Sequence, residues 1–374
     1  MPPTDRLLAH ERARYSRHLL LSQVGEAGQL RLKNARVLCI GMGGLGSPLS
    51  LYLAAAGVGT LGLVDFDTVE GSNLQRQIVH GEADIGRPKV HSARDRLLAL
   101  NPHINLEIHN TRLDAQNAMA LISAYDVIAD GADNFATRYL VNDACVLAGR
   151  PNVHASIFRF EGRLSVFGLP EGPCYRCLHP TPPPPGAVPS CGEAGVLGIL
   201  PGALGTLQAT EVIKLLLGIG KPLVGRLLLY DALAMSFEEI GIFKHPRCPR
   251  CSDAPTLEGL EEELAVCAAP ISTPSTTPLE ATQWRESHLF LDVREAGELA
   301  ICSLSWAQHI PLGELANRLE EIPRDRPIVA LCRSGVRSLT AQSLLLEANF
   351  PTVLNLEGGI LRWAAEVDQT LIPY

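Results

Sequence analysis

The sequence contains no long block of lysine or arginine, and its formal net charge is −8. This disfavours binding to nucleic acid or anionic lipid as the main activity, because such binding depends on clustered positive charge. The N-terminus also lacks the continuous apolar core of a signal peptide, since charged residues interrupt its leucines. We therefore expect a cytoplasmic protein that binds neither nucleic acid nor membrane.

Charged residues are scarce at 19%, whereas hydrophobic residues make up 46% of the chain, which excludes a disordered or fibrous protein. At roughly 150 residues per domain, 374 residues indicate two or three domains. Residues 37–64 carry no charge and are long enough to span a bilayer, but seven glycines and a proline interrupt them. That pattern favours strands, a glycine turn and a helix inside a soluble sheet.

Alternating short apolar runs and amphipathic segments predict an α/β fold whose mostly parallel sheet has helices on both faces. The predicted strands are Arg36–Ile40, Thr60–Asp65, Asp126–Asp130 and Arg226–Tyr230, and the predicted helices are Ser47–Ala56, Lys89–Leu100, Asn134–Ala148 and Gly205–Gly218. A proline-rich surface crossover is expected at Pro180–Pro189. Beyond the uncharged segment Ala268–Pro278, a second α/β unit follows. We predict a first domain at 1–254, a flexible linker at 255–282 and a small domain at 283–374.

A glycine-rich turn, Gly41–Gly46, joins the first predicted strand to a helix, and Asp65 ends the next strand. Backbone amides of such a turn can approach phosphates, and the carboxylate can hold ribose hydroxyls. A tight turn without ligand is the alternative, and NAD fits these features as well as ATP. Arg76 and Lys89 favour a triphosphate, and Asp133 can hold magnesium. Asn134 is better explained as a helix N-cap.

At this point the chain resembles the MoeB/ThiF family of adenylating enzymes, bacterial relatives of ubiquitin-activating E1 proteins. The resemblance covers Glu11–Cys251 and includes Arg14–His18, Gly41–Pro48, Leu63–Gln77, Asp130–Asp143 and Ser190–Gly198. It implies a homodimer in which Arg17 reaches the ATP of the other subunit, with Arg17 and Asp133 as catalytic residues. The ATP site that we predict consists of Gly41, Gly43, Gly44, Asp65, Ser72, Asn73, Leu74, Gln75, Arg76, Lys89, Asp133 and Asn134.

Two C-x-x-C pairs, Cys174/Cys177 and Cys248/Cys251, provide the four thiolates of a tetrahedral zinc site. Either pair alone can be a redox dithiol, but neither follows a strand in the thioredoxin manner. Cys191 stands among glycines and prolines in a predicted exposed loop, where a catalytic thiol and a structural cysteine are equally good interpretations. The family resemblance places Cys191 at a loop thiol whose role differs among members.

A second candidate nucleophile, Cys332, begins a loop between a strand and a helix, with Arg333 and Arg337 close behind it. Loop amides, the helix N-terminus and two arginines would stabilise a thiolate. A cysteine phosphatase needs C-x5-R, whereas here Arg337 is the fifth residue after the cysteine, which favours sulfur over phosphate chemistry. The stretch from about residue 283 resembles a rhodanese domain, with a departure at Ile301–Gln308.

The order of these domains resembles that of the fused MoeZ-type enzymes. The hypothesis is that ATP, with Mg²⁺, adenylates the C-terminal glycine of a ubiquitin-like sulfur carrier ending in Gly-Gly, in a chain that also holds Zn²⁺. A persulfide on Cys332, charged by thiosulfate or a cysteine desulfurase, then gives a thiocarboxylate for molybdopterin or a related sulfur-dependent biosynthesis. The alternative is an E1-like enzyme that holds its carrier as a thioester on Cys191 for protein conjugation.

Overall fold

The computed structural model describes residues 5–183, 195–260 and 274–371, which fall into two compact units. Cys191, most of the predicted proline-rich crossover and the middle of the predicted linker lie outside the described residues. Within the described ranges, no helix combines the length and apolar character that a membrane span requires.

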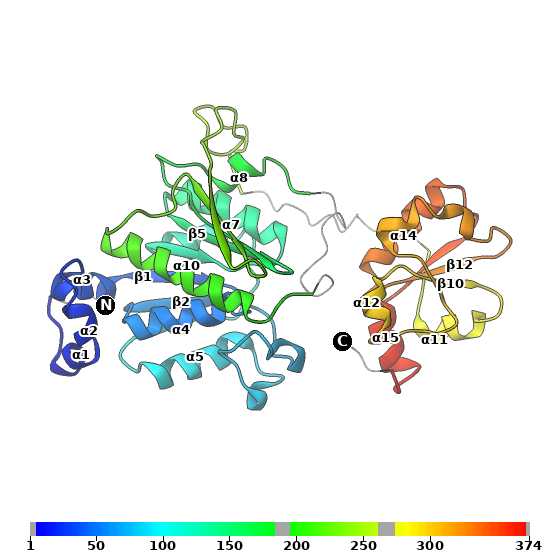
Figure 1. Cartoon of the computed structure of the whole chain (residues 1–374), viewed down its shortest axis with the longest axis horizontal. Coiled ribbons are helices and arrows are strands. Elements are labelled where there is room, and N and C mark those ends of the chain that lie inside the picture. The colour runs from blue at the N-terminus through cyan, green and yellow to red at the C-terminus, as the bar shows by residue number, and fades with distance from the viewer. Residues whose placement is uncertain (1–4, 184–194, 261–273, 372–374) are drawn as a thin grey trace. The chain divides into compact units, whose positions relative to one another are not determined.

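The first unit is built on one sheet (Figure 1). Its strands follow the order β3-β2-β1-β4-β5-β6-β7-β8. Strands β3, β2, β1, β4 and β5 are parallel to one another. Strands β6, β7 and β8 follow, and each is antiparallel to its neighbours. Their bounds are β1 Arg36–Ile40, β2 Thr60–Val64, β3 Asn105–His109, β4 Val127–Asp130, β5 Asn152–Phe158, β6 Glu161–Phe167, β7 Arg226–Asp231 and β8 Ser236–Gly241.

Helices cover both faces of the parallel half of this sheet. On one face α4, α5 and α10 pack on alternate strand residues such as Val37 and Cys39, and on the other face α6 and α7 pack on Leu38 and Ile40. The helices are α1 Ala9–Arg14, α2 Ser16–Leu19, α3 Gly25–Asn34, α4 Gly46–Ala56, α5 Lys89–Leu100, α6 Ala118–Ser123, α7 Phe135–Ala148, α8 Tyr175–Leu178 and α10 Leu200–Leu217, with short 3-10 turns at Gly71–Asn73 and Glu82–Asp84.

The α/β class and the early strands and helices are therefore as predicted, whereas strands β5, β6 and β8 and the antiparallel pairing on that side of the sheet are not. The predicted strand near Arg226 is real, but it pairs antiparallel with its neighbours. Strands β5 and β6 form a hairpin in which Asn152 pairs with Phe167 and Phe158 with Glu161. Such a hairpin needs no crossover helix, so the alternation of strands and helices does not reveal it.

The second unit holds a parallel sheet with the order β11-β10-β12-β13-β9. Strand β9 and helix α11 belong to this unit although they lie within the interval predicted as linker, because β9 pairs with β13. Its elements are β9 Ser275–Thr276, α11 Pro278–Ala281, the 3-10 turn Thr282–Trp284, β10 Leu289–Asp292, α12 Ala296–Leu299, β11 Gln308–His309, α13 Leu312–Leu315, the 3-10 turn Leu319–Glu321, β12 Ile328–Leu331, α14 Val336–Glu347, β13 Val353–Leu356 and α15 Gly359–Glu366.

The segment 301–308, where the sequence departs from the rhodanese pattern, is packed into this second unit. Cys302 and Leu304 are buried, and the ring of Trp306 meets the rings of Phe290 and Trp363 at centroid distances of 4.7 and 5.8 Å. The altered sequence therefore still supplies core contacts to the domain.

Candidate functional site

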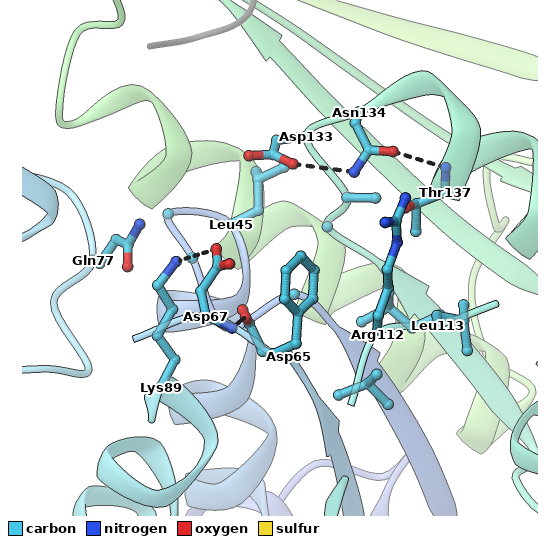
Figure 2. Close-up of a pocket in the computed structure, with 18 of the residues that line it drawn as sticks. Leu45, Asp65, Asp67, Gln77, Lys89, Arg112, Leu113, Asp133, Asn134 and Thr137 are labelled. Atoms are coloured by element: carbon cyan, nitrogen blue, oxygen red, sulfur yellow. Dashed lines mark hydrogen bonds and ion pairs between the residues drawn. The ribbon is translucent and has the colours of Figure 1, made fainter. Parts of the chain in front are cut away.

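A cavity of about 130 Å³ opens at the carboxyl ends of the parallel strands of the first unit (Figure 2). This is the edge where open α/β sheets bind ligands. Of the predicted ATP-site residues, the cavity is lined by Gly41, Gly43, Gly44, Asp65, Arg76, Lys89, Asp133 and Asn134. The structure therefore brings together residues that are up to 93 positions apart in the sequence, from Gly41 to Asn134.

Glycine is required in the turn after β1 for two separate reasons. Gly41 has φ = 85°, a left-handed conformation that other residues adopt only with strain. At Gly46 a Cβ atom would lie 1.9 Å from the carbonyl oxygen of Gly41, so any side chain would push the turn apart. The turn consequently places bare backbone against the cavity.

The carboxylate of Asp65 locks this turn to the end of β2. It accepts hydrogen bonds from the backbone N–H of Met42 at 2.7 Å and from that of Asp67 at 2.9 Å. Burial raises the pKa of Asp65, and the positive charge of Lys89 partly offsets that rise. Each carboxylate oxygen has two lone pairs, so Asp65 can still accept hydrogen bonds from ribose hydroxyls.

Cations surround the cavity, and the sequence indicated only some of them. The Nζ of Lys89 donates to Asp67 Oδ2 at 2.9 Å, and the Arg76 guanidinium donates to the carbonyl oxygen of Ser72 at 3.1 Å. Two further cations, Arg112 and Arg138, also line the cavity and were not predicted. The same is true of two uncharged or acidic residues of the lining, Gln77 and Asp67. Asp67 was detectable as the second aspartate of an Asp-Phe-Asp run, and Arg138 as the residue four positions after Asn134.

Asn134 caps helix α7, as predicted, by accepting a hydrogen bond from the backbone N–H of Thr137 at 2.9 Å. Asp133 precedes it and stands exposed at the cavity, where its Oδ1 accepts a 3.5 Å hydrogen bond from the Asn134 amide. A carboxylate in this position can hold a divalent cation beside a phosphate.

The remaining predicted ATP-site residues do not line the cavity within the described chain. They form or follow the 3-10 turn that precedes Arg76, and they are Ser72, Asn73, Leu74 and Gln75. Arg17 lies exposed on the short helix α2, away from this lining. Cys191 lies outside the described residues, so its predicted role stays a prediction.

The four cysteines of the two C-x-x-C pairs converge in one cluster, with all sulfur atoms within 4.8 Å of one another. The Sγ atom of Cys174 lies 3.5 Å from that of Cys248 and 3.9 Å from that of Cys177, which lies 3.3 Å from Cys251. A tetrahedral zinc with Zn–S bonds of about 2.3 Å needs sulfur atoms roughly 3.8 Å apart. The donor set therefore fits zinc.

In the second unit Cys332 follows β12, and its side chain is fully buried. The backbone N–H of Gly335 donates to Cys332 Sγ at 3.1 Å, and the Ser338 hydroxyl donates to it at 3.4 Å. A contact from helix α15 also fixes the start of the loop, because the N–H of Ile360 donates to the Cys332 carbonyl oxygen at 2.8 Å. Donors directed at a sulfur stabilise its anion.

Arg337 forms a buried ion pair with Glu298, a partner that the sequence did not indicate. Its two terminal nitrogens donate to the two carboxylate oxygens of Glu298, each at 2.7 Å, and both side chains are buried. Glu298 also accepts a 2.9 Å hydrogen bond from the backbone N–H of Glu295. The pair therefore anchors the first turn of α14 to α12, a contact that sequence spacing alone does not reveal.

Comparisons with known proteins agree with this geometry. The ThiF family model matches residues 15–250, and the rhodanese-like domain model matches residues 275–366. The chain is 50% identical over 382 residues to the "Probable adenylyltransferase/sulfurtransferase MoeZ" of Mycobacterium tuberculosis strain H37Rv, an alignment that covers 100% of this chain and 97% of the relative. It is 44% identical over 409 residues to the "Adenylyltransferase and sulfurtransferase MOCS3" of Bos taurus, covering 100% and 90%.

Among solved structures, the crystal structure of E. coli MccB with ATP matches with a TM-score of 0.57 and 24% identity. The match covers 65% of this chain and 75% of that chain. At this identity the likeness supports the fold alone.

Proposed function

Because the chain belongs to the ThiF family and carries a rhodanese-like domain, we propose that it adenylates the C-terminal glycine of a ubiquitin-like sulfur carrier protein and then transfers sulfur to that carboxyl group. The chain is an adenylyltransferase and sulfurtransferase, as its full-length relatives are named. The carrier, its Gly-Gly end and the order of the two steps are part of the proposal.

The observation that carries the proposal is the presence of two complementary sites in one chain: a cavity lined with phosphate-binding groups and a loop that directs donors at a cysteine sulfur. The first site suits activation of a carboxylate by a nucleotide, and the second suits a sulfur nucleophile. An enzyme that only adenylates would have no use for the cysteine loop, and an enzyme that only transfers sulfur would have no use for the cavity.

In the adenylation step, the glycine carboxylate attacks the α-phosphorus of ATP and pyrophosphate leaves, giving an acyl adenylate. Asp65 holds the ribose, while Arg76 and Lys89 balance the charge that develops on the phosphates. Asp133 would hold Mg²⁺, which adds positive charge at the phosphates when it is bound. Arg17 would extend from a second subunit of a homodimer, a part of the proposal that comes from the family resemblance.

In the sulfur step, the terminal sulfur of a persulfide on Cys332 attacks the acyl carbon and AMP leaves, which joins carrier and enzyme through an acyl disulfide. Attack by the Cys191 thiol on the Cys332 sulfur would release the thiocarboxylate and leave a disulfide between the two cysteines. A cellular thiol must then reduce that disulfide, and thiosulfate or a cysteine desulfurase would recharge Cys332. The four cysteines around the proposed zinc take no part in this chemistry.

The decisive experiment incubates the protein with ATP, Mg²⁺, thiosulfate and a small carrier protein ending in Gly-Gly, and measures the carrier by mass spectrometry. We expect a mass gain equal to replacement of one oxygen by sulfur, which disappears in Cys332→Ala. A carrier that stays unmodified, or that gains sulfur equally well with Cys332→Ala, contradicts the proposal. A stable thioester on Cys191 that passes the carrier to other proteins would instead favour a conjugating enzyme.

A further inference from the structure

Asp143, in the second half of helix α7, binds both cysteine knuckles through one carboxylate. The Arg176 guanidinium donates to Asp143 through Nε at 2.9 Å and through a terminal nitrogen at 2.8 Å. A terminal nitrogen of Arg250 donates to the same carboxylate at 3.2 Å. Arg176 is the third residue of Cys-Tyr-Arg-Cys and Arg250 the third residue of Cys-Pro-Arg-Cys, so the two knuckles contribute equivalent positions.

These contacts are buried, which makes them strong and hard to replace. The side chain of Asp143 is 2% exposed, that of Arg176 4% and that of Arg250 0%. Water cannot replace a lost hydrogen-bond partner at this depth, so a displacement of either knuckle changes the hydrogen bonds of the Asp143 carboxylate. The neighbouring Asn142 adds to the attachment, because its Oδ1 accepts the backbone N–H of Tyr175 at 2.7 Å.

The other end of α7 belongs to the nucleotide cavity. Asn134 caps the helix there, and Thr137 and Arg138 of its first turn line the cavity. Arg138 also donates through Nε to the carbonyl oxygen of Ala132 at 3.0 Å, next to Asp133. Arg138 and Asp143 are five positions apart, a rise of roughly 7.5 Å along an α-helix. A rigid helix of this length transmits a displacement from one end to the other.

We propose that Asp143 is a positioning residue that couples the four-cysteine metal site to the nucleotide cavity through α7. A metal ion fixes the two knuckles relative to each other, and their arginines then hold α7 in the position that places Asp133 and the first turn of α7 at the cavity. This inference rests on the proposed ATP site. Because coupling between two sites is reciprocal, bound ATP must also raise the equilibrium affinity for the metal.

The test uses the full chain loaded with Zn²⁺, and measures ATP affinity by calorimetry and zinc affinity by equilibrium competition with a coloured chelator. We expect metal-free wild type to bind ATP about tenfold more weakly than the zinc form, and saturating ATP to raise the equilibrium affinity for zinc by the same factor. Asp143→Asn, checked for one zinc per chain, is expected to bind ATP as weakly as metal-free wild type and to have a zinc affinity that ATP does not change.

Two further variants keep the test decisive. Arg250→Met leaves the Asp143–Arg176 pair intact and serves if Asp143→Asn does not fold; it is expected to reduce the coupling in the same direction. Asp126→Asn makes the matched chemical change at an exposed position just before β4, at the end of the sheet opposite the cavity. This variant should retain full coupling.

The outcomes separate the two hypotheses. Equal ATP affinity in folded zinc-loaded and metal-free wild type, or unchanged coupling in Asp143→Asn, overturns the positioning role. A loss of thermal stability in Asp143→Asn without any change in ATP affinity or in the effect of ATP on zinc affinity also overturns it. Wild-type protein that binds no ATP at all contradicts the proposed function itself.

Discussion

The two candidate sites are built in opposite ways. The nucleotide cavity is a hollow at the ends of parallel strands, and charged groups such as Asp133 and Arg112 stand exposed at its rim. The Cys332 loop is closed, its sulfur is buried and already receives two hydrogen bonds, and its arginine at position 337 is paired with Glu298.

This difference matches what each site must accommodate. ATP brings its own charges, and its products pyrophosphate and AMP leave after each turnover, so a cavity can use exposed charged groups that lose little free energy when no nucleotide is bound. A persulfide is a covalent extension of the protein, so its loop must keep one geometry throughout. Substitutions at the cavity should therefore change binding and rate, whereas substitutions around the loop should also change stability.

The largest effect is expected for Cys332→Ala, which removes the sulfur that forms the persulfide. Sulfur transfer from thiosulfate to cyanide should fall by a factor on the order of a thousand or more, because no other group can form the covalent intermediate. Carrier-dependent exchange of pyrophosphate into ATP should stay at the wild-type rate. If that exchange falls as well, the two sites do not act independently in adenylation.

Asp133→Ala should produce the reverse pattern. Loss of the carboxylate that would hold Mg²⁺ should lower ATP–pyrophosphate exchange by about a hundred- to a thousandfold, the usual cost of removing an electrostatic contact to the transition state. Sulfur transfer to cyanide should be unaffected, since Asp133 belongs to the first unit. Exchange that survives the substitution would remove Asp133 from the proposed role.

Glu298→Gln tests whether the second site depends on its buried ion pair. Arg337 would lose the carboxylate of Glu298 as its buried ion-pair partner, which should destabilise the second unit by about 3–5 kcal/mol. Chemical denaturation followed by tryptophan fluorescence reports on this unit, since Trp284, Trp306 and Trp363 all lie in it.

The matched control is Glu314→Gln in the same unit. Glu314 also pairs with an arginine, Arg318, but the side chain of Glu314 is 57% exposed. An exposed pair contributes at most about 1 kcal/mol, so this variant should unfold almost as wild type does. Equal destabilisation by both substitutions would show that burial of the Glu298–Arg337 pair is not what matters.

The sequence predicted those parts of the sites that are encoded locally. The glycine turn, Asp65 and the two cysteine pairs follow from short motifs, and the structure places each of them together with its predicted neighbours. Asn134 was recognised as an N-cap because its partner lies only three residues away. Spacing within one turn or one strand end was sufficient in these cases.

Contacts between distant segments were not predictable in this way. Arg112 reaches the cavity from the segment after β3, and Glu298 meets Arg337 across 39 residues. The strands of the β5–β6 hairpin do alternate polar and apolar residues, as in Asn152–Ile157, but this pattern does not specify their antiparallel pairing. Each of these features depends on strand order in the sheet, which a local pattern does not specify.

The smallest predicted effect concerns the pH dependence of ATP binding, and it arises only at the cavity. Burial raises the pKa of Asp65 above the usual value for aspartate, which is about 3.9. Its carboxyl group therefore takes up a proton at a higher pH than an exposed aspartate does when the solution is acidified. A protonated carboxyl is a weaker acceptor for ribose hydroxyls than a carboxylate, because a hydrogen bond to a charged group contributes more free energy than one between neutral groups.

We accordingly expect ATP affinity to be full at neutral pH and to fall by up to about tenfold as the pH drops through the raised pKa of Asp65. The same calorimetric titration on Asp65→Asn supplies the control, because this variant keeps the shape of the side chain and the titration of ATP itself but lacks the ionisable group. The difference between the two profiles isolates Asp65. Parallel profiles would mean that the carboxylate serves only to hold the glycine turn through Met42 and does not contact the nucleotide.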